Sequence, residues 1–121
     1  MRRVFIVDDD LPLRETFTLL CEALGVEEAA SAGSLSELAD RSAQALRANL
    51  ILIDINLGDG EPNGLAVFRW LKEHGFKGRA VFFTGHAKSD PMVQEVSRAA
   101  GVPVLSKPLP IESIEKLLEA A

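Results

Sequence analysis

Residues 4–10 read VFIVDDD, four consecutive apolar side chains followed by three aspartates. An uninterrupted apolar run of this length is typical of a strand covered on both faces, as in a parallel sheet that lies between two layers of helices. Because the run ends at a cluster of carboxylates, the strand is expected to deliver acidic side chains to one edge of the sheet. Both features favour an α/β fold with its polar chemistry at the carboxyl ends of the strands.

Four further apolar runs follow, each separated from the next by a stretch with helical periodicity. They lie at residues 26–30, 50–53, 80–83 and 102–105. Five strands that alternate with helices predict an open, doubly wound parallel sheet with right-handed crossovers. Glu27 and Glu28 interrupt the second run, which favours an edge position for that strand.

The stretches between the strands carry helix start and stop signals. Side chains that favour the N-terminal cap stand at Asp10, Ser34, Asn63 and Asp90, and glycines that favour the C-terminal end stand at Gly25, Gly75 and Gly101. The last helix is expected to follow Pro110 and Ile111. Residues 34–37 have the form of a capping box, and the helix that they open is expected to run to about Arg47.

Length and composition place the chain among soluble globular proteins. Its 121 residues fit one domain, 1–121, and 47% of them are hydrophobic while 26% are charged. The net charge of −5 argues against unspecific binding to nucleic acid or to anionic membranes. Only four apolar residues follow Arg2 and Arg3, too few for a secretory signal, and the lone Cys21 cannot form an internal disulfide. We therefore expect a cytoplasmic protein with no nucleic-acid or membrane partner and no separate output domain.

The residues that follow the predicted strands suggest a cation site. In doubly wound sheets, ligands bind at the carboxyl ends of the strands, near the point where the strand order reverses. An aspartate there is most often a turn former or a helix cap, and this interpretation is favoured for Asp10. It is poor for Asp8, Asp9 and Asp54 together, because converging carboxylates repel one another unless a cation lies between them. A cluster of oxygen donors favours a hard divalent cation such as Mg²⁺.

Beside such a cation, Asp54 could act as a nucleophile toward a phosphoryl group and form an acyl phosphate. Phosphoryl transfer leaves charge on three oxygens. The cation would neutralise one of them, the ammonium of Lys107 a second, and the hydroxyl of Thr84 with nearby backbone N–H groups the third. Thr84 and Lys107 are weak signals individually, and they gain value because both follow predicted strands.

Taken in order, four segments resemble the response-regulator receiver domain over essentially the whole chain. They are Val7-Asp8-Asp9-Asp10, Asp54-Ile55-Asn56, Thr84-Gly85 and Lys107-Pro108. The resemblance implies a flavodoxin-like (βα)5 fold with strand order 2-1-3-4-5, and a Mg²⁺-dependent transfer of a phosphoryl group from a phosphohistidine onto Asp54.

The resemblance also implies the roles of the other site residues. The metal ligands would be Asp9, Asp54 and the backbone carbonyl of Asn56, with Asp8 acting through water. Thr84 and Lys107 match the phosphate-sensing pair, and the peptide bond between Lys107 and Pro108 matches one that is cis in the family.

For partners, the resemblance implies a sensor histidine kinase or a histidine phosphotransfer protein, and a downstream protein. Docking is expected to use Leu11, Leu13, Arg14, Phe17, Pro108 and Leu109. Output is expected to use the face formed by the helix after Asp90, the strand at 102–105 and the last helix. Residues 99–109 are similar to receivers at the ends of hybrid histidine kinases, so a free-standing regulator and an excised hybrid-kinase domain both remain open.

Two features depart from the family pattern. The segment from Asp54 to Gly64 is about two residues longer than usual and has Gly58 where the family usually has proline, which predicts a more mobile loop. Val104 stands where the family often has tyrosine or phenylalanine, so signalling would pass through backbone shifts or partner contacts.

Two other functions remain as alternatives. One is a Mg²⁺-dependent phosphohydrolase with Asp54 as nucleophile, although such enzymes usually have a second aspartate where this chain has Asn56. The other is a receiver-like scaffold that has lost phosphorylation, which Val104 and the altered loop suggest. The complete set of Asp8, Asp9, Asp54, Thr84 and Lys107 favours the phosphoacceptor over both.

Overall fold

The computed structural model describes residues 2–86, 89–108 and 111–120. The strands are β1 (Arg3–Val7), β2 (Glu28–Ala32), β3 (Leu50–Asp54), β4 (Arg79–Thr84) and β5 (Val104–Ser106). The helices are α1 (Leu11–Ala23), α2 (Leu35–Asp40), α3 (Ser42–Leu46), α4 (Gly64–Glu73), α5 (Pro91–Ala100) and α6 (Ile111–Ala120). Throughout these ranges, no helix combines the length and the apolar character that crossing a bilayer requires.

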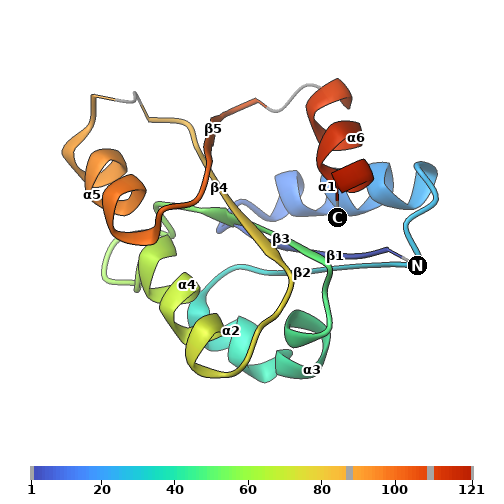
Figure 1. The fold of residues 1–121 in the computed structure, drawn as a ribbon, viewed down its shortest axis with the longest axis horizontal. Coiled ribbons are helices and arrows are strands. Elements are labelled where there is room, and N and C mark those ends of the chain that lie inside the picture. Colours follow the sequence, from blue (N-terminus) through green and yellow to red (C-terminus); the bar gives the residue numbers. More distant parts are fainter. Residues whose placement is uncertain (1, 87–88, 109–110, 121) are drawn as a thin grey trace.

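The strands form one parallel sheet in the order β2-β1-β3-β4-β5, which confirms the predicted doubly wound topology (Figure 1). In the register of the sheet, Val7 pairs with Ile53, and Thr84 pairs with Ser106. The residues that follow these strands therefore reach the same edge of the sheet. This edge carries Asp8, Asp54 and Lys107.

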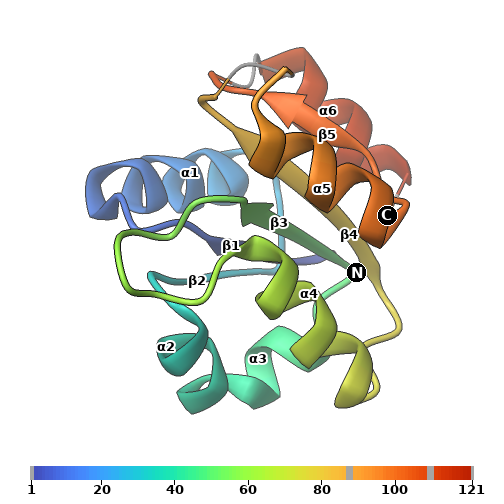
Figure 2. The ribbon, with the colours of Figure 1, turned by 90° about the vertical axis from the view of Figure 1, so that its left-hand side faces the viewer.

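Helices cover both faces of the sheet, with α1 and α6 on one side and α2, α3 and α4 on the other (Figures 1 and 2). Every residue of the central strand β3 is buried. Its side chains alternate between the two layers: Leu50 and Leu52 belong to the core cluster that includes α1 and α6, and Ile51 and Ile53 to the cluster on the opposite face. Burying each such side chain contributes about 1.5–3 kcal/mol, so β3 is a rigid support for the aspartate at its end.

The four predicted helix caps are confirmed. The side chains of Asp10, Ser34, Asn63 and Asp90 accept hydrogen bonds from the backbone N–H groups of Leu13, Glu37, Ala66 and Met92. Each cap satisfies one of the N–H groups that a helix leaves unpaired in its first turn. The caps therefore fix where each helix leaves the sheet edge.

The prediction of one continuous helix from residue 35 to about Arg47 is wrong, because the segment forms two short helices that meet at Arg41. The backbone of Arg41 has φ −111° and ψ 30°, outside the helical range. Its guanidinium donates hydrogen bonds to the carbonyl of Ser31 in β2 and to Glu37. The break between α2 and α3 therefore coincides with a contact between Arg41 and β2.

Two strands begin later than predicted. β2 begins at Glu28 because the N–H of Val26 still donates to the carbonyl of Cys21, as part of the C-terminal end of α1. β5 begins at Val104, directly after Pro103, whose nitrogen carries no hydrogen to donate. The edge position of β2 is confirmed. Pro110, expected to lead into the last helix, lies outside the described residues.

Candidate functional site

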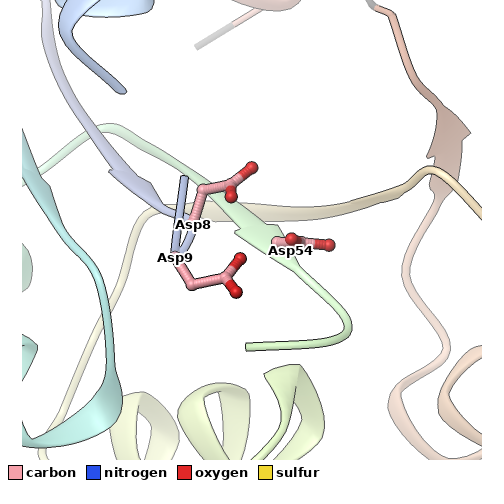
Figure 3. Close-up of side chains that lie close together, drawn as sticks. All are labelled: Asp8, Asp9 and Asp54. Atoms are coloured by element: carbon pink, nitrogen blue, oxygen red, sulfur yellow. The ribbon is translucent and has the colours of Figure 1, made fainter. Parts of the chain in front are cut away.

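Three aspartates lie together at the carboxyl ends of β1 and β3. Carboxylate oxygens of Asp8, Asp9 and Asp54 all lie within 4.8 Å of one another. Figure 3 shows the side chains of Asp8 and Asp9 extending from the end of β1 toward the side on which Asp54 lies. Asp8 and Asp54 are 0% and 5% exposed, whereas Asp9 is exposed. A set of carboxylate oxygens at this spacing fits a hard divalent cation such as Mg²⁺.

Lys107 reaches this cluster from the end of β5. Its Nζ donates hydrogen bonds to Oδ2 of Asp8 at 2.8 Å and to Oδ2 of Asp54 at 3.1 Å. The same nitrogen lies 4.8 Å from the centre of the Phe83 ring, and the backbone N–H of Lys107 donates to the carbonyl of Thr84. The peptide bond between Lys107 and Pro108 is cis, as the family resemblance implies. Lys107 is thus fixed at both its backbone and its ammonium group.

The charges in the cluster change one another's pKa values. Burial, together with repulsion from Asp8, raises the pKa of Asp54 to about 6, although Lys107 opposes this change. Partial burial and the charge of Asp8 also raise the pKa of Asp9. Burial alone would lower the pKa of Lys107, but its hydrogen bond to Asp8 and the charge of Asp54 raise it overall. One ammonium faces three carboxylates, so the site has an excess of negative charge that a bound cation would offset.

Thr84 lies at the end of β4 and is 1% exposed. Its hydroxyl oxygen accepts a hydrogen bond from the backbone N–H of His86 at 3.0 Å. Nε2 of His86 lies 3.5 Å from the side-chain nitrogen of Asn56, which extends from the loop after β3. These contacts connect the loops that follow β3 and β4.

An open pocket of about 380 Å³ lies over the cluster. Its lining residues are Asp9, Asp54, Asn56, Gly58, Asp59, Gly85, His86 and Lys107. The structure therefore brings four of the predicted site residues to one pocket. Asp8 and Thr84 are buried beside it and do not line it. Asp59 was not among the predicted site residues. The only feature of the sequence that could have indicated it is its position in the long loop between Asp54 and Gly64.

The two ends of the loop between β3 and α4 lie close together (Figure 2). The N–H of Gly64 donates to the carbonyl of Ile55 at 2.8 Å. A Cβ atom at Gly64 would lie 2.6 Å from the carbonyl oxygen of Asp54 and 2.9 Å from Cα of Ile55. Only glycine permits this approach, so the base of the loop is closed directly behind Asp54.

Two residues expected to dock a partner are mostly buried. Arg14 and Phe17 are 8% and 7% exposed, and the guanidinium of Arg14 donates to Oε1 of Glu37 at 3.1 Å. The prediction is wrong for Arg14, whose side chain turns into the interior toward Glu37. Phe17 is mostly buried, but it lines the groove beside the start of α1. Leu11 is 52% exposed and remains available. Leu109 lies outside the described residues.

An open groove of about 400 Å³ lies between the start of α1 and the segment after β5. Leu13 and Pro108 line it together with Pro12, Leu20 and Ile114. The groove adjoins the cation cluster, because Asp10 and Lys107 also belong to its lining. The exposed part of the expected docking surface therefore lies directly beside the pocket.

Comparisons with known proteins agree with this fold. A family model described as the response regulator receiver domain matches residues 4–119. A receiver domain (CheY-like) from Methylobacillus flagellatus is similar in structure, with 27% identity, a TM-score of 0.77, and coverage of 99% of this chain and 98% of that one. A receiver domain protein from Clostridium thermocellum, at 18% identity, supports the fold, with a TM-score of 0.81 and coverage of 99% and 93%. No curated protein matches in a search by sequence.

One further similar structure is that of a response regulator protein from Burkholderia pseudomallei, described as having a phosphorylated aspartic acid, a calcium ion and citrate. The two chains are 25% identical, with a TM-score of 0.78. The comparison covers 98% of this chain and 66% of that one.

Proposed function

The chain belongs to the response regulator receiver domain family, a family of signalling domains in two-component systems, and from that premise we propose that Asp54 is its phosphoacceptor. The donor would be a phosphohistidine on a sensor histidine kinase or a histidine phosphotransfer protein. The observation that carries the proposal is the position of the Asp54 carboxylate, which lines the pocket and accepts a hydrogen bond from Lys107 at 3.1 Å.

In the proposed step, a carboxylate oxygen of Asp54 attacks the phosphorus atom of the phosphohistidine. An O–P bond forms as the P–N bond breaks, and the electron pair of the broken bond stays on the imidazole nitrogen. The attack requires an ionised Asp54, and with a pKa of about 6 this carboxyl is mostly ionised at neutral pH. The ammonium of Lys107 lies 3.1 Å from Oδ2 of Asp54 and would offset the charge of the incoming phosphoryl group.

Asp9, Asp54 and the backbone carbonyl of Asn56 would hold Mg²⁺, with Asp8 acting through water. Asp9 and Asp54 have carboxylate oxygens within 4.8 Å of each other, and both line the pocket with Asn56. A bound Mg²⁺ would neutralise negative charge on a phosphoryl oxygen. The similar Burkholderia structure, whose description names a phosphorylated aspartic acid and a calcium ion, supports an aspartate-and-divalent-cation site in the family.

The signal would leave the site through Thr84 and Lys107. The Thr84 hydroxyl oxygen accepts a hydrogen bond from the backbone N–H of His86, and its own proton would be free to be donated to a phosphoryl oxygen on Asp54. Such a change would shift a pre-existing balance of conformations on the face of α5, β5 and α6, where a downstream protein would bind. Half-buried Val104 belongs to this face and stands where the family often has an aromatic side chain. Because that aromatic side chain is lacking, the shift would be transmitted by the backbone or by contacts with the partner.

Intact-mass measurement tests the proposal. After incubation with Mg²⁺ and either acetyl phosphate or phosphoramidate, we expect a mass increase of one phosphoryl group. The increase should vanish in Asp54→Asn and in the presence of a chelator. Asp10→Asn is the matched control, because Asp10 caps α1 and asparagine caps a helix equally well.

Each alternative function predicts a different outcome. An unmodified mass with both donors and Mg²⁺ would favour the phosphorylation-independent scaffold. Continuous release of phosphate from phosphate esters, in molar excess over the protein, would favour the phosphohydrolase. A receiver should release phosphate only from its own Asp54.

A further inference from the structure

Asp59 lies in the loop between β3 and α4 and lines the pocket together with Asp9 and Asp54. We propose that Asp59 is an outer carboxylate of the cation site: it raises the affinity of the site for Mg²⁺ through its charge and through bound water, without ligating the ion directly. This inference rests on the proposed function, because it assumes that the aspartate cluster binds a divalent cation.

Hydrogen bonds within the loop define the position of Asp59. The N–H of Gly58 donates to Oδ1 of Asn56 at 3.0 Å, and the N–H of Glu61 donates to the carbonyl of Gly58 at 3.3 Å. Asp59 is thus a central residue of a tight turn, between Gly58 with φ 109° and Gly60 with φ 77°. Both angles lie in the left-handed region that glycine adopts without strain. The loop that carries Asp59 therefore has a defined course beside the pocket.

The backbone next to Asp59 runs close to the expected metal ligands. A Cβ atom at Gly58 would lie 3.6 Å from Oδ2 of Asp9. This separation is an ordinary van der Waals contact, so the backbone at Gly58 passes directly beside the carboxylate of Asp9. The turn that carries Asp59 therefore adjoins the aspartate cluster.

The geometry assigns Asp59 to the outer shell rather than to the ligand set. Among the described residues, the carboxylates whose oxygens lie within 4.8 Å of one another are those of Asp8, Asp9 and Asp54, and Asp59 is not in this group. Asp59 is exposed, and within the described ranges no lysine, arginine or histidine forms an ion pair with it. Among the residues that the structure describes, no cationic side chain pairs with it, so its charge can act on a cation in the pocket.

The expected effect is modest and depends on salt. A carboxylate that acts through water on a divalent cation at roughly 8 Å changes its binding constant by about fivefold. The Debye length falls from about 10 Å at 0.1 M salt to about 3 Å at 1 M, so the effect should largely disappear at high ionic strength. Loss of a direct ligand would weaken binding far more and would persist in salt.

The test is a Mg²⁺ titration of the purified chain without any phosphodonor, followed by calorimetry and by the rise in the midpoint of thermal unfolding. Asp59→Asn should bind Mg²⁺ about fivefold more weakly than the parent at low ionic strength and nearly equally at about 1 M salt. Glu61→Gln is the matched control: it removes one charge from the same turn, but Glu61 does not line the pocket. It should weaken Mg²⁺ binding clearly less than Asp59→Asn does, because the Coulomb energy falls with distance from the ion. Without Mg²⁺, all three proteins should unfold at the same temperature.

The outcomes separate this inference from the proposed function. Equal Mg²⁺ affinities for Asp59→Asn and Glu61→Gln would overturn the outer-carboxylate role, provided that Asp9→Asn still abolishes binding. A loss in Asp59→Asn of more than about fiftyfold that salt does not reduce would also overturn it, by making Asp59 a direct ligand. If the parent does not bind Mg²⁺, or Asp9→Asn binds it equally well, the proposed cation site itself fails.

Discussion

Replacing Asp54 with asparagine is expected to stabilise the metal-free protein at about pH 8. The folded-state pKa of Asp54 is about 6, above its ordinary value of 3.8, because of burial and the nearby charge of Asp8. A group with a raised carboxyl pKa binds more protons in the folded state than in the unfolded state. The free energy of unfolding therefore falls as pH rises through the window from 3.8 to about 6, and stays lower above it. Asparagine carries no charge and avoids this loss.

The size of the effect follows from the same pKa values. A rise from 3.8 to about 6 corresponds to about 3 kcal/mol at 1.36 kcal/mol per pKa unit. Relaxation of the site and entry of water reduce this figure, so we expect a gain of about 2 kcal/mol at pH 8. At a typical dependence of about 2 kcal/mol per molar urea, the midpoint of unfolding should rise by about 1 M.

Urea unfolding with a chelator present, at about pH 8 and about pH 4, measures the effect. The gain should be present at pH 8 and much smaller at pH 4, where the folded form of Asp54 is largely protonated and the unfolded form, with its pKa of 3.8, is only partly ionised. Asp10→Asn is the control, since Asp10 is exposed and caps α1. A loss of stability in Asp54→Asn at pH 8, or an equal gain at both pH values, would refute the argument that buried, like-charged carboxylates destabilise the empty site.

Three further perturbations test other parts of the structure. Lys107→Ala should lower the free energy of unfolding by about 3 kcal/mol at pH 8, because it leaves two buried carboxylates without their shared ammonium; unchanged urea unfolding would contradict the pairing. Gly64→Ala should cost more than about 2 kcal/mol, since its Cβ would lie 2.6 Å from the carbonyl oxygen of Asp54, whereas Gly85→Ala, with its nearest contact at 3.9 Å, should change urea unfolding little. Cys21 is fully buried, and burial raises the pKa of its thiol to about 11, so a thiol reagent at pH 8 should label it only when the protein opens; rapid labelling of the native chain would show that the thiol is accessible.

The topology and much of the pocket could be predicted from the sequence because they depend on strand ends. Continuous apolar runs identify the buried strands, and parallel strands bring their carboxyl ends to one edge. This rule places Lys107 beside Asp54 across 53 residues of chain, and the hydrogen bond between them is present. The helix caps were predictable for a similar reason, since a cap depends on the side chain at one position and a backbone group two or three residues away.

Features that depend on side-chain contacts between elements could not be predicted in this way. The break between α2 and α3 involves the contact of Arg41 with Ser31 in β2, which no local pattern indicates. Arg14 was expected on the surface because the start of the first helix flanks the site. Its partner, Glu37, lies 23 residues away on another helix. Asp59 was not predicted to line the pocket, because the path of a glycine-rich loop cannot be inferred from its composition.

The closed base of the loop between β3 and α4 makes the position of Asp54 independent of the sequence at the tip of the loop. Because the chain returns to Ile55 within hydrogen-bond distance at Gly64, residues can be inserted or exchanged at the tip while the aspartate at the end of β3 keeps its place. The tip is thus a module that selection or protein engineering can vary, adjusting how strongly the pocket attracts cations and how readily charged donors approach it. The carboxylate of Asp54 remains anchored in the sheet through such changes.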